Sequence, residues 1–191
     1  MKKTILILLL GIGLSANAQK SNTQAYDLIL KLIPDAGKTT SWQSAKDATK
    51  GLVTWTKATP SKEIIEYNII GQAMLGYDSQ QIKCDGKPCE TSVTLSGPTT
   101  KTYNLIVLEL PPDGLPAIQL EKLFGKKQFT AKIVKKEIDE GLGGVIYYEV
   151  QFPGKPLVWI QTSTFPAYRE EQSNDFSITV FLSKKDMLSR M

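Results

Sequence analysis

The strongest constraint on the fold is a repeated pattern of alternating apolar and polar residues, interrupted by Gly, Pro, Asn and Asp. Each alternating segment has the length of one strand and is bounded by turn-forming residues. The segments fall into two groups of four: 62–70, 76–84, 89–96 and 102–110, then 129–138, 144–152, 157–163 and 176–182. Because consecutive segments are joined by turns, the sequence predicts two antiparallel meanders.

Helical periodicity precedes each meander. Apolar residues in 25–33 share one helix face, and Pro34 ends that segment. We expect a second helix over 44–56 and a third over 117–124, where Gly125 fits a left-handed cap. The predicted fold class is therefore α+β: two tandem units, each a helix plus a four-stranded antiparallel meander, with the helices packed on one sheet face.

The two units match each other at an offset of 68 residues. This offset superimposes Gly76 on Gly144 and the Gly-Lys-Pro triplet 86–88 on 154–156. The turn-forming residues match better than the side chains between them. We interpret the match as a degenerate internal duplication.

The first 18 residues have the pattern of an export signal. Lys2 and Lys3 precede an apolar run, and Ala16-Asn17-Ala18 has the small residues of a cleavage site. We expect cleavage before Gln19 and a periplasmic or secreted mature protein. The predicted organisation has three parts: a signal peptide, 1–18, the N-terminal helices with the first meander, 19–112, and the helix with the second meander, 113–191. The second and third parts form either two domains or one continuous domain.

Cys84 and Cys89 flank a predicted hairpin loop over 85–88. A four-residue loop would place the two cysteines directly opposite each other, within the distance that a disulfide spans. Exported proteins meet an oxidising environment, in which such pairs persist. The sequence therefore predicts a Cys84–Cys89 disulfide.

The composition excludes several kinds of site. The chain has no histidine, which removes Ser-His-Asp and Cys-His nucleophile systems and histidine-ligated zinc. Two cysteines cannot supply a four-thiolate zinc site, and phosphate-binding Gly motifs are missing. Removing the two signal-peptide lysines lowers the formal net charge from +4 to +2. We expect no cofactor, no metal, no nucleic-acid partner and no membrane span in the mature chain.

The outer face of the second predicted hairpin differs from that of the first. Counting from its loop places Tyr147 and Glu149 on the same face as Val158 and Ile160, whereas the first hairpin carries polar residues there. The loop after this hairpin is five residues longer than its counterpart. It carries Tyr and Arg, which are enriched in binding hot spots. The predicted partner-binding residues are Tyr147, Glu149, Val158, Ile160, Tyr168 and Arg169.

These features favour an exported, non-catalytic binding protein, inhibitor-, immunity- or adaptor-like, that engages a protein partner through this face. Another explanation is that a loop or the N-terminal helix of the chain covers the face. Two other functions stay open: a periplasmic carrier of a lipid or small apolar ligand, which needs an apolar cavity, and a carboxylate-dependent hydrolase of envelope glycans, which needs two acids across a cleft. In topology alone, the expected arrangement resembles the secreted beta-lactamase inhibitory proteins, and that resemblance implies a protein partner.

Overall fold

The computed structural model describes residues 23–56, 59–60, 67–73, 83–84, 87–88, 91–110, 119–139, 143–165 and 175–191. The expected signal peptide and its cleavage site lie outside the described residues, as do Cys89, Tyr168 and Arg169. The side chain of Cys84 is outside them too. Export, the new N-terminus at Gln19 and the disulfide therefore stay predictions.

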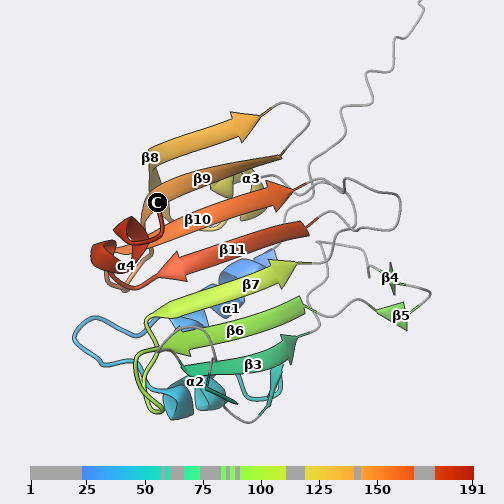
Figure 1. Cartoon of the computed structure of the whole chain (residues 1–191), viewed down its shortest axis with the longest axis vertical. Coiled ribbons are helices and arrows are strands. Elements are labelled where there is room, and N and C mark those ends of the chain that lie inside the picture. Colours follow the sequence, from blue (N-terminus) through green and yellow to red (C-terminus); the bar gives the residue numbers. More distant parts are fainter. Residues whose placement is uncertain are drawn as a thin grey trace, which may run out of the picture.

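One antiparallel sheet organises the described chain (Figure 1). Eight strands follow the order β1-β3-β6-β7-β11-β10-β9-β8, and β2 pairs with β3 beside this path. The strands are β1 (Val53–Trp55), β2 (Thr59–Pro60), β3 (Tyr67–Ala73), β6 (Thr91–Gly97), β7 (Leu105–Leu110), β8 (Thr130–Asp139), β9 (Gly143–Gln151), β10 (Val158–Phe165) and β11 (Asp175–Phe181). The predicted α+β class and antiparallel sheet are confirmed.

The second predicted meander forms as expected, because β8, β9, β10 and β11 pair in sequence order. It joins the first group of strands through β11 and β7, with Phe181 opposite Leu105. Strands from both halves of the sequence therefore form one continuous sheet. The internal duplication stays an interpretation of the sequence.

The first meander differs from its prediction. We expected segment 89–96 to pair with 76–84, but β6 pairs with β3, which places Thr94 opposite Ile70. A separate pair, β4 (Lys83–Cys84) and β5 (Lys87–Pro88), places Cys84 opposite Lys87 and not opposite Cys89. The predicted four-residue loop was wrong, because an Asp-Gly pair stands between these strands and favours a two-residue connection.

Four helices flank the sheet in the described chain: α1 (Thr23–Leu32), α2 (Trp42–Ala48), α3 (Leu120–Leu123) and α4 (Lys184–Leu188). The helix expected over 44–56 was wrong beyond residue 48. Gly51 has a φ of +80°, which L side chains rarely adopt, and the β-branched and aromatic residues after it form β1. Gly125 after α3 has a φ of +61°, as predicted for a left-handed cap. None of the helices in the described residues is long and apolar enough to cross a membrane.

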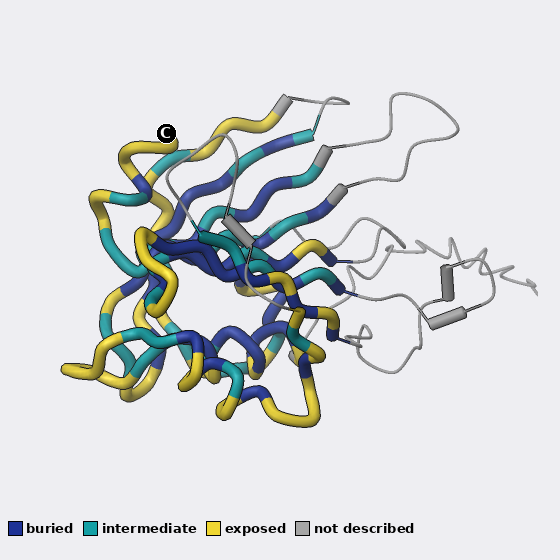
Figure 2. The backbone as a smooth tube through the Cα atoms, turned by 60° about the horizontal axis from the view of Figure 1, so that its bottom comes forward, coloured by how far each residue is buried: buried dark blue, intermediate teal, exposed yellow. Residues whose placement is uncertain are grey.

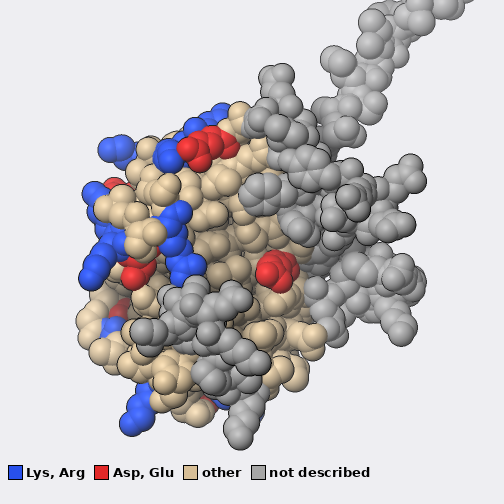
Figure 3. Space-filling view, in the orientation of Figure 1, with Lys and Arg blue, Asp and Glu red and all other residues tan. Residues whose placement is uncertain are grey.

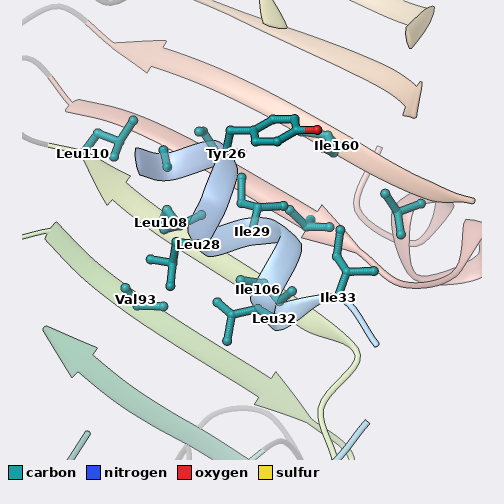
Figure 4. Packing of buried hydrophobic residues seen from close by; sticks show 14 of the residues in the cluster. Tyr26, Leu28, Ile29, Leu32, Ile33, Val93, Ile106, Leu108, Leu110 and Ile160 are labelled. Atoms are coloured by element: carbon teal, nitrogen blue, oxygen red, sulfur yellow. The ribbon is translucent and has the colours of Figure 1, made fainter. Parts of the chain in front are cut away.

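The main core lies between α1, α2 and α3 and the inner face of the sheet. The predicted apolar face of α1 is buried against β6 and β7, and Figure 4 shows its side chains directed at Val93, Ile106 and Leu108. Each fully buried Leu or Ile stabilises the fold by about 1.5–3 kcal/mol. Tyr26 continues this core toward the rings of Phe124 and Phe152, at centroid distances of 5.3 and 5.5 Å.

The expected packing of all helices on one sheet face was wrong. Met187 of α4 is buried in a second cluster with Leu105, Tyr147 and Phe181. These three strand residues point away from α1, because their neighbours in sequence, such as Ile106 and Tyr148, belong to the main core. The C-terminal helix therefore packs on the opposite face of the sheet, which we call the outer face (Figure 1).

Candidate functional site

The pairing of β9 with β10 decides which side chains share the outer face. Between these strands, Lys155 N donates a hydrogen bond to Phe152 O at 3.2 Å, and Gly154 has a φ of +72°. Pro153 followed by Gly154 is the residue pair that a type II turn requires. Seven residues, 151–157, lie between the paired Val150 and Val158, and the register places Tyr147 opposite Gln161 and Glu149 opposite Trp159, which is one residue away from the register predicted for a four-residue loop.

A shift of one residue moves a whole strand to the other face. Val158 and Ile160 are both 0% exposed in the main core, so their predicted place on the outer face was wrong. Figure 4 shows Ile160 in this core. Tyr147 and Glu149 do lie on the outer face, and Tyr168 and Arg169 are outside the described residues. The structure thus brings together two of the six predicted residues and separates them from two others.

The predicted register did not identify Trp159 and Gln161, which are the outer-face neighbours of Glu149 and Tyr147 on β10. The Pro-Gly dipeptide at 153–154 predicts a turn but not this register, because a two-residue turn centred on it would pair Glu149 with Val158, whereas the structure pairs Glu149 with Trp159.

Two parts of this outer cluster differ in burial. Its centre, Leu105, Tyr147 and Phe181, is closed by Met187. Its margin is partly buried and comes from β7, β9 and β10: Val107, Val145 and Trp159. Among the described residues, the buried indole nitrogen of Trp159 has no hydrogen-bond partner.

α4 covers this cluster from one end only. Ser183 caps the helix. Its hydroxyl oxygen accepts a hydrogen bond from Asp186 N at 3.2 Å, and its O–H donates a hydrogen bond to Asp186 Oδ2 at 2.5 Å. The helix has five residues, of which Met187 is fully buried and Leu188 is 56% exposed. The alternative that the chain covers its own outer face therefore holds for the cluster's centre, although the covering element is the C-terminal helix and not the N-terminal one.

Charged groups surround the cluster. Figure 3 shows basic side chains gathered around α4 and near β8, beside a mostly uncharged central surface. Lys135 forms an ion pair with Glu137 at 2.8 Å, and the hydrogen bond that its ammonium group donates to the Glu137 carboxylate raises the pKa of Lys135. Burial raises the pKa of Tyr147, so its phenol is neutral at physiological pH. Lys184 and Lys185 are exposed on α4.

A separate cavity of about 580 Å³ lies at the C-terminal end of α1. Its polar groups complete hydrogen bonds of the helix end: Lys155 Nζ donates to Ile33 O and to Asp35 Oδ1, both at 2.9 Å, and the Tyr103 hydroxyl donates to Leu32 O. The last carbonyls of a helix have no partner within it, so these contacts have a structural purpose. They make this cavity a weaker candidate for ligand binding than the outer face is for a partner.

Within the described ranges, no group of three or more Cys, Asp or Glu side chains lies close enough to hold a metal ion. Comparison of the chain with protein-family models, with curated proteins and with solved structures finds no match in any of the three.

Proposed function

We propose that the mature chain is an exported, non-catalytic binding protein that engages a protein partner through its outer sheet face. The observation that carries this proposal is the cluster of apolar side chains on that face, of which Val107, Val145 and Trp159 are only partly buried. Apolar surface surrounded by polar and charged groups is typical of partner sites.

The margin supplies the kinds of group that partner sites use. Trp159 carries a large, partly buried apolar ring, and Trp is enriched in binding hot spots. Val107 and Val145 flank the cluster on the same face. A partner that covered these side chains would gain roughly 25 cal/mol for each Å² of apolar surface removed from water.

The surrounding charge suggests the character of the partner. Lys184 and Lys185 on α4 are exposed at the edge of this surface. Complementary charge speeds association and selects among partners. We therefore expect the partner to present an apolar projection bordered by acidic residues.

The test compares four forms of the mature chain, the unaltered one and the variants Trp159→Ala, Leu52→Ala and Ile160→Ala, each immobilised and exposed to the same envelope extract. Trp159→Ala should weaken retention of the partner about thirtyfold, which corresponds to about 2 kcal/mol. Leu52→Ala removes an apolar side chain that is 51% exposed on the loop between α2 and β1, and it should leave retention unchanged.

Thermal unfolding of each variant provides the control for folding. Ile160→Ala should lower the melting temperature strongly, because Ile160 is fully buried in the main core, yet it should leave binding per folded molecule unchanged. If Trp159→Ala alters only the melting temperature and retains the same proteins as the unaltered chain, the proposal is wrong.

A further inference from the structure

β8 is the last strand at one edge of the sheet. It pairs with β9 on one side, and no strand of the described residues lies along its other side. β8 has ten residues, which is long for an edge strand. Most of its described side chains are exposed (Figure 2), including Ile133, Val134 and Ile138 at 50%, 44% and 49%.

A β-bulge divides this strand. Ile133 is opposite Tyr148, but Lys135 is opposite Tyr147, so Val134 is an extra residue. Three residues of β8 lie on the outer face: Lys132 before the bulge, and Lys135 and Glu137 after it. Their partners on β9 are the outer-face residues 149, 147 and 145, in that order. Residues 145, 147 and 149 are two positions apart along β9. The backbone N–H and C=O groups of the three β8 residues opposite them therefore point toward the same side of the strand.

We propose that β8 pairs antiparallel with β8 of a second copy of the chain, so that two sheets join across a two-fold axis. Side chains opposite each other in a sheet share a face. Lys132 can therefore meet Lys135, Glu137 or Asp139 of the other copy, but not Lys136 or Ile138.

Charge and length select one of these three registers. Lys132 opposite Lys135 would place like charges together, and Lys132 opposite Asp139 would leave residues 130 and 131 without partners. Lys132 opposite Glu137 forms two opposite-charge pairs across the axis and uses the full strand. The same register matches Ala131 with Ile138, which covers an exposed apolar side chain.

The proposed partner is a second copy because the strand is complementary to itself. On the outer face Lys132 lies in the first half of β8 and Glu137 in the second, as an antiparallel two-fold pair requires, and in this register Lys135 lies opposite Val134. The lysines and the bulge disfavour indiscriminate pairing with other strands, since they interrupt a flat apolar edge. This interface is separate from the partner site of the proposed function, and neither depends on the other.

Sedimentation velocity of the mature chain should show a monomer–dimer equilibrium at concentrations up to about 100 μM. Lys132→Glu alone and Glu137→Lys alone each convert two opposite-charge pairs into two like-charge pairs, so each should raise the dissociation constant of the dimer at least tenfold. Lys50→Glu, on the exposed turn after α2, makes the same charge change away from β8 and should leave the constant unchanged.

The decisive sample is an equimolar mixture of Lys132→Glu and Glu137→Lys. In a mixed dimer the new carboxylates of one chain face ammonium groups of the other, so dimers should return. This recovery also controls for the loss of the ion pair between Lys135 and Glu137 within one chain. A monomeric unaltered chain, a dimer that neither charge reversal weakens, or a mixture that stays monomeric would each overturn the proposal.

Discussion

At the scale of single residues, Asp35 joins two distant parts of the chain. Its carboxylate accepts hydrogen bonds from Lys155 at 2.9 Å and from Lys38 at 3.3 Å, and Lys155 follows the turn between β9 and β10. These hydrogen bonds, that of Lys155 first, lower the pKa of Asp35 below its ordinary value of 3.8. The contact thus fastens the end of α1 to that turn.

The sign of this shift predicts an acid-dependent effect of Asp35→Asn. A lowered pKa in the folded state adds stability above pH 3.8, and that stability is lost as the pH falls through the lowered value. The melting temperature of the unaltered chain should therefore exceed that of the variant at pH 7, and the difference should shrink below pH 4. The control is Asp47→Asn, a substitution at an exposed position of α2. A difference that persists undiminished to pH 2 would contradict this assignment.

Tyr103 has the opposite dependence on pH. Burial raises its pKa to about 12, and its hydroxyl donates to Leu32 O at the end of α1. Stability from this group is present below pH 10 and is lost as the pH rises through 12. Tyr103→Phe should cost about 1–3 kcal/mol at pH 7, because a buried carbonyl loses its donor, and it should flatten the loss of stability between pH 10 and 12. Urea unfolding at several pH values measures the loss of stability at pH 7 and the change in the free energy of unfolding between pH 10 and 12. If the variant and the unaltered chain lose stability equally over that alkaline range, the result would be inconsistent with a buried phenol.

At the scale of elements, α4 is held by one side chain. Met187 is fully buried in the outer cluster, whereas Leu188 beside it is mostly exposed. Met187→Ala should lower the free energy of unfolding by about 2–3 kcal/mol, because it leaves a cavity. Leu188→Ala should change it by less than about 0.5 kcal/mol. Equal effects of the two substitutions in urea unfolding would show that α4 does not pack as described.

Local signals in the sequence explain which elements were predicted. The 3.6-residue period identified α1 and its buried face, and alternation identified β8 to β11. A helix of five residues with one buried side chain has no detectable period, so α4 was missed. The register of β9 and β10 was missed by one residue, because the predicted loop has an even number of residues, whereas seven residues lie between the paired Val150 and Val158. That error alone placed Val158 and Ile160 on the wrong face.

At the scale of the whole molecule, two pairings make the sheet continuous. β11 pairs with β7, and β3 pairs with β6 across an intervening segment of the chain. Turn residues predict which consecutive strands pair, but they carry no information about strands brought together from distant parts of the sequence. The sequence therefore predicted the fold class and the second meander but not the joined sheet. The joined sheet is what creates the outer face, since Leu105 of β7 and Phe181 of β11 meet only there.

In the proposed complex, a partner covers the outer face at the margin of its apolar cluster. Hydroxyl-radical labelling of the mature chain, alone and bound to the protein that it retains from envelope extract, tests this when the modified residues are quantified by mass spectrometry. Binding should protect Trp159 several-fold and leave Leu52, on the loop after α2, labelled as before. Unchanged labelling of Trp159 in the complex, with protection elsewhere on the chain, would contradict it.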